Sequence, residues 1–91
     1  MFAIIGGWPV DEALDADQLD HIAATVREEP GFVRGYWGQE AGTSSSAHAV
    51  VVLEDEGSAT AMADRVRAAI PSATIHVVAV LAQAEARGRA R

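Results

Sequence analysis

The segments expected to form strands are apolar on both sides, and this feature limits the fold more than any other. Successive residues of a strand point to opposite faces of its sheet, so a sheet with one face in water shows alternating apolar and polar positions. The segments 2–5, 50–53 and 75–81 carry apolar residues at both odd and even positions instead. Both faces of the sheet that they build must therefore be covered.

Four strands and two helices are predicted along the chain. Each strand is an apolar stretch bounded by glycine, proline or short polar residues. The helices show apolar residues at i, i+3, i+4 and i+7, as in Leu19, Ile22 and Val26. The strands are expected at 1–8, 32–39, 47–53 and 74–82, and the helices between residues 15 and 30 and between residues 54 and 71.

Carboxylates mark the start of each predicted helix. Asp15 or Asp17 can cap the first helix, and Asp15 and Gln18 have the spacing of a capping box. The second helix opens on Glu-Asp-Glu at 54–56, and negative charges suit the positive end of a helix dipole.

The two halves of the chain, about 1–38 and 45–82, repeat the layout strand, helix, strand. This order predicts an α+β fold of the ferredoxin-like βαββαβ type. Right-handed crossovers then give an antiparallel sheet in the order 4-1-3-2, with both helices on one face. We expect a single domain over 1–82, followed by a polar, arginine-rich tail over 83–91.

Two helices cover only one face of such a sheet, so the second apolar face needs another partner. Left open, it would expose several hundred square ångströms, which soluble monomers rarely tolerate. The simplest cover is the same face of a second copy, which predicts a homodimer in which two sheets close on each other. Partial cover by the tail is the alternative.

Composition excludes several classes of function. The chain has 91 residues, no cysteine and a net charge of -6, and three of its seven arginines lie in the last five residues. The body therefore lacks the basic face that a nucleic-acid binder needs, and a thiolate metal site is excluded. No apolar run is long enough to span a membrane and no signal peptide is recognised, so a cytoplasmic protein is expected.

Two short segments resemble a known group of proteins. They are Glu-Pro-Gly-Phe-Val at 29–33 and Val-Val-Val-Leu-Glu-Asp at 50–55, which runs into an alanine-rich helix. Together with the layout of 1–82 they resemble the dimeric α/β-barrel superfamily, and within it proteins similar to antibiotic-biosynthesis monooxygenases. The resemblance implies two sheets closing into a dimeric barrel, with a pocket between the sheet and the helices of each protomer. It also implies oxygenation of an aromatic or polyketide-like metabolite without a cofactor.

The polar positions of that family differ here. Leu53 stands where oxygenases commonly have tryptophan, Ala49 where they often have asparagine, and Gly38 near the position of a histidine. Either the site is rebuilt from other residues or this protein has another role. The alternative functions are a non-catalytic small-molecule binder and a structural homodimer.

The predicted topology brings aromatic and histidine residues to one end of the sheet. Neutral histidine serves as a general base near pH 7, and aromatic walls suit a flat apolar substrate. Large aromatics also close small cores, and a histidine at a strand start is often only solvated. The candidate catalytic residues are His48, Trp37 and Tyr36, and the candidate substrate-binding residues are Trp8, Arg34, His76, Leu53 and Met62.

Side-chain direction and spacing qualify these candidates. If Leu53 faces the helices, His48 points to the opposite face and becomes an interface residue. The backbones of His48 and His76 are separated by one strand, about 10 Å, so no metal site is expected. Arg34 could hold an anionic group or act as a solubilising charge on an edge strand.

Overall fold

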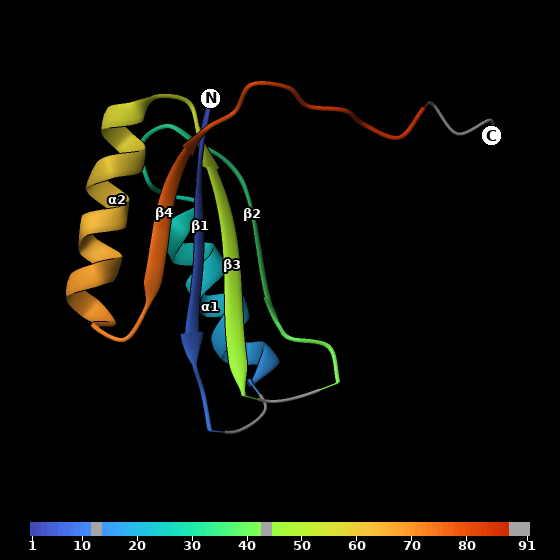
Figure 1. The fold of residues 1–91 in the computed structure, drawn as a ribbon, viewed down its shortest axis with the longest axis vertical. Helices are drawn as coiled ribbons and strands as arrows, with labels where there is room; N and C mark the ends of the chain where they lie inside the picture. Colours follow the sequence, from blue (N-terminus) through green and yellow to red (C-terminus); the bar gives the residue numbers. More distant parts are fainter. Residues whose placement is uncertain (12–13, 43–44, 88–91) are drawn as a thin grey trace.

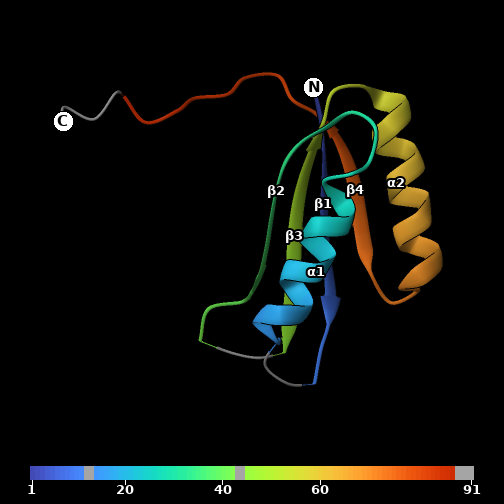
Figure 2. The same ribbon diagram turned by 180° about the vertical axis from the view of Figure 1, so that it is seen from behind.

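The computed structural model describes residues 1–11, 14–42 and 45–87. It is an α+β fold in which a four-stranded antiparallel sheet carries two helices on one face, as Figures 1 and 2 show from opposite sides. The element order is the one predicted and is compatible with a ferredoxin-like topology. The elements are β1 (Phe2–Pro9), α1 (Ala16–Val26), β2 (Phe32–Gln39), β3 (Ser46–Leu53), α2 (Glu56–Ala69) and β4 (Thr74–Ala79).

The strand order is β2-β3-β1-β4, which is 4-1-3-2 when counted from the β4 edge. The two central strands, β1 and β3, pair along their full length, with Ile4 opposite Val51 and Gly6 opposite Ala49. Apart from the irregularity between Phe32 and Arg34 in β2, these registers divide the strand residues between a face that meets the helices and an open face without helices.

β4 ends at Ala79, three residues earlier than predicted. Ala79 pairs with Phe2, the first residue of β1, and the Val80 N–H donates to the Met1 carbonyl (3.0 Å). Residues 81–87 then run away from the body as an exposed arm (Figure 1). The arm therefore does not cover the open face, and Arg89 and Arg91 lie outside the described residues.

Both helices begin at an aspartate. Asp15 caps α1 and accepts a hydrogen bond from the Asp17 N–H (2.9 Å), so the predicted reciprocal box with Gln18 is not formed. Asp55 caps α2, which begins one residue after it and not at residue 54. Its carboxylate accepts bonds from the Ser58 N–H (2.7 Å) and the Ser58 hydroxyl (3.2 Å).

The Asp55 cap makes stability depend on pH in the acid range. The hydrogen bond from the Ser58 N–H, and then that from its hydroxyl, lower the pKa of the Asp55 carboxyl below its ordinary 3.8. A carboxyl with a lowered folded-state pKa stabilises the fold above its unfolded pKa, and this contribution is lost as the pH falls through the folded pKa. We expect Asp55→Asn to lower the urea midpoint at pH 7 and the two midpoints to converge below pH 3.8. Equal midpoints at pH 7 would contradict this assignment.

The core lies between the sheet and α2. Leu53 is fully buried and packs in one cluster with Ala59 and Ala63 of α2. In contrast, α1 contributes no buried residue, and its Ile22 remains exposed. The first helix is therefore held against the sheet by much less apolar contact than the second.

Candidate functional site

A cavity of about 210 Å³ lies between the sheet and the two helices. We call it the helix–sheet cavity. Trp8 and Trp37 line it from the sheet, and its floor includes Gly6 and Ala49. The helices line it with Ile22 and Val26 from α1 and with Met62, Val66 and Ile70 from the α2 side.

Small residues in the centre of the sheet create this space. Trp37, Ala49, Gly6 and Ile75 form one row across the four strands. The two central residues, Gly6 and Ala49, have little or no side chain. The row therefore has large side chains at its two ends and empty space between them. A Cβ atom at Gly6 would lie 2.6 Å from Cδ1 of Ile75, so a larger residue there would require the Ile75 side chain to shift.

Trp37 acts as a wall of the cavity because its ring lies over the backbone of its own strand. A Cβ atom at Gly35 would lie 2.6 Å from Cη2 of Trp37, which is too close for an ordinary contact. Glycine at position 35 therefore allows the Trp37 indole to pack against the backbone of β2. In this position the ring does not fill the middle of the cavity.

Two charged residues, Glu29 and Arg65, also line the helix–sheet cavity. Nη2 of Arg65 lies 2.9 Å from Oε2 of Glu29, so the pair joins α2 to the turn that follows α1. Neither residue was among the site residues predicted from the sequence. Helical spacing could have indicated Arg65, since it lies three residues after Met62 and one before Val66, and both of these residues line the cavity.

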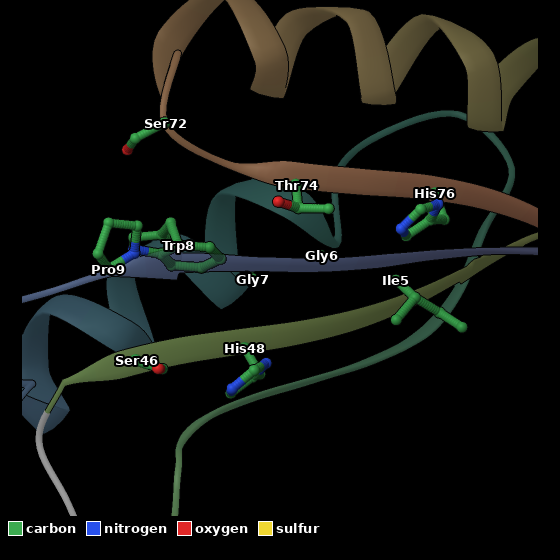
Figure 3. Close-up of a pocket in the computed structure, with 10 residues that line it drawn as sticks. All are labelled: Ile5, Gly6, Gly7, Trp8, Pro9, Ser46, His48, Ser72, Thr74 and His76. Carbon is green, nitrogen blue, oxygen red and sulfur yellow. The ribbon is translucent and has the colours of Figure 1, made fainter.

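A second hollow, of about 420 Å³, lies on the open face (Figure 3). Its floor is Gly6 and Gly7, and His48, Thr74 and His76 stand around it on the neighbouring strands. The His48 ring leans over Gly7, where a Cβ atom would lie 3.0 Å from its Nδ1. Among the described residues, no group of three or more His, Asp or Glu side chains could hold a metal ion.

The structure divides the predicted cluster of aromatic and histidine residues between the two faces of the sheet. Trp8 and Trp37 line the helix–sheet cavity, as does Met62, although Trp8 also reaches the rim of the open-face hollow. These residues lie towards the same end of the sheet, but their side chains are divided because neighbouring strand residues point to opposite faces. By register, Tyr36, Arg34, His48 and His76 belong to the open face.

Two further candidates also have clear positions. Leu53 faces the helices but lies in the core and does not line the helix–sheet cavity. Because Leu53 faces the helices, His48 points to the open face, as expected from the alternation of side chains along a strand. Its Nε2 lies 4.0 Å from Oε1 of Glu40. Among the described residues, the lining of the helix–sheet cavity thus includes no histidine, and its charged residues are Glu29 and Arg65.

No known protein family matches the chain, and no curated protein is significantly similar to it. In the part of the chain that the structure describes, no helix is long and apolar enough to cross a membrane. The fold and the geometry of the two hollows therefore carry the functional argument.

Proposed function

We propose that the protein binds a small, flat, largely apolar molecule in the helix–sheet cavity. The observation that carries this proposal is an apolar cavity walled by both tryptophans of the chain. An apolar cavity of about 150 Å³ in another protein holds benzene. The volume of about 210 Å³ is thus suited to one or two fused rings.

The weak packing of α1 supports binding at this place. Ile22 and Val26 line the cavity, yet no residue of α1 is buried. A ligand between the sheet and these side chains removes apolar surface from water at about 25 cal/mol per Å². Binding should therefore also stabilise the folded chain.

The proposal is tested by titrating the protein with 2-naphthol and following tryptophan fluorescence. Saturable quenching is expected because the indoles of Trp8 and Trp37 would contact the ligand. Ala49→Phe fills the floor of the cavity and should weaken binding at least about tenfold, a loss of about 1.4 kcal/mol. Ala68→Phe adds the same ring at an exposed position of α2 and should bind as the wild type does. Absence of saturable quenching, or equal binding by both variants, would refute the proposal.

We also propose that two copies associate through their open faces to form a homodimer. Exposed apolar residues lie there, among them Ile5 and Val78. Folded monomers of this mass expose about 5,000 Å², whereas this chain exposes 6311 Å². The difference of about 1,300 Å² exceeds the roughly 800 Å² that each partner buries in a standard interface, and the exposed arm accounts for part of it.

A second candidate function is the oxygenation of an aromatic or polyketide-like molecule in the same cavity, without a cofactor, as in the monooxygenases that the sequence resembles. The two indole walls favour it, because they suit a flat polycyclic substrate. In such a reaction a ring CH₂ group becomes a carbonyl. It takes one atom of O₂, and its two hydrogens leave with the other atom as water, so no external reductant is needed.

Oxygen consumption with anthrone as the probe tests this second candidate. Turnover above the uncatalysed rate is expected to fall on Trp37→Leu and to persist in His48→Gln, because His48 lies on the other face of the sheet. No turnover in the wild type would exclude anthrone oxygenation. Saturable binding without turnover would support a binding protein. The absence of both binding and turnover would favour a structural homodimer.

A further inference from the structure

We propose that Arg65 binds an anionic group of the ligand, so that the helix–sheet cavity selects a flat apolar acid over its neutral analogue. This inference rests on the proposed binding function and names the class of ligand. It starts from the one charged pair on an otherwise apolar lining.

The pair lies where the cavity meets solvent. The Glu29 side chain is 30% exposed and the Arg65 side chain 57%. A ring held between Trp8 and Trp37 can thus direct a polar substituent towards the guanidinium while its apolar body stays inside. Such an amphiphilic orientation leaves the charge of the ligand in contact with water and with Arg65, which avoids burying it unpaired.

Arg65 retains hydrogen-bonding capacity for a ligand. A guanidinium has five N–H donors arranged to match carboxylates. In the described part of the chain, the one carboxylate contact of Arg65 is made by Nη2 to Glu29. The remaining donors can meet a second carboxylate, and Glu29 orients the guanidinium while competing with that ligand for its charge.

Other arginines near the cavity are engaged or point elsewhere. Arg67 is bound to Asp64 (3.2 Å) and to the Ile75 carbonyl (3.1 Å). Arg34 belongs to the open face. Within the described residues, Arg65 is the one cation on the cavity lining. Because the chain carries a net charge of -6, an acid would gain little from the rest of the surface.

The test compares 2-naphthoate with 2-naphthamide, which have the same rings and differ in charge. Tryptophan fluorescence should show the acid binding about fivefold more tightly to the wild type, since an ion pair with a partly exposed arginine contributes up to about 1 kcal/mol. Arg65→Met should remove this preference, because it should weaken binding of the acid much more than binding of the amide. Glu29→Gln should tighten binding of the acid several-fold, because it removes the competing charge.

Arg27→Met is the matched control, since it removes one positive charge from an exposed position outside the cavity lining. It should keep the preference for the acid. Equal affinities of the wild type for acid and amide would overturn the role of Arg65 but leave the binding function standing. If neither compound binds, the binding function itself fails.

Discussion

Replacing Ile5 by glutamate is expected to convert the proposed homodimer into a monomer. Ile5 lies on β1 in the centre of the open face, opposite Val50 on one side and His76 on the other. It is 44% exposed in the single chain, so the fold of one protomer should tolerate the change. A two-fold interface would bury two unpaired carboxylates, each costing about 3–5 kcal/mol. The dissociation constant should therefore rise by at least about four orders of magnitude.

Native mass spectrometry or light scattering measures the mass of the assembly and so distinguishes a dimer from a monomer. The wild type should have twice the 9.5 kDa mass of the chain, and Ile5→Glu the mass of one chain. Ile22→Glu provides the control, because Ile22 is 41% exposed but lies on α1, on the other side of the sheet. That variant should remain dimeric. A monomeric wild type at micromolar concentration, or a dimeric Ile5→Glu, would disprove association through the open face.

The second large effect is expected from Leu53→Ala. Leu53 is fully buried at the end of β3, and its helical neighbours in the core include Ala59 and Ala63. These short side chains cannot move into the space that the leucine leaves, so most of the resulting cavity should persist. Leu-to-Ala changes at buried sites lower the free energy of unfolding by about 2–5 kcal/mol, and we expect the upper half of that range.

Urea unfolding followed by circular dichroism gives the measurement. Leu53→Met is the control, since a swap of similar volume should cost less than about 1.5 kcal/mol. A loss below about 1 kcal/mol in Leu53→Ala would mean that the core at this position is less tightly packed than the structure indicates. Because an intact dimer adds stability, both variants should be compared with the wild type at one protein concentration.

Much of the fold followed from local signals in the sequence. Pro30 and Gly31 marked the turn after the first helix, where Gly31 adopts a φ of 80° that favours glycine. Asp55 marked the start of the second helix. The end of β4 could not be found in this way, because the sequence remains apolar past Ala79. That strand ends at the residue that pairs with Phe2, the first residue of β1, and this depends on register across the sheet.

The candidate site was less predictable because it depends on the direction of each side chain and on the empty space left by small residues. Tyr36 and Trp37 are neighbours in sequence but belong to opposite faces of the sheet. The floor of the cavity exists because Gly6 and Ala49 have little side chain, and small residues give no chemical signal. Glu29 and Arg65 are far apart in sequence, so their contact could be seen only after folding.

The absence of buried residues from α1 has a consequence for the lifetime of the protein. A helix with so little apolar contact can detach at a lower free energy than the rest of the domain needs to unfold. In the proposed complex, a molecule held against Ile22 and Val26 would raise that free energy, because the cavity exists only while the helix is in place. Proteases that cut the detached helix would then remove empty chains faster than loaded ones, so the abundance of the protein would follow the supply of its ligand.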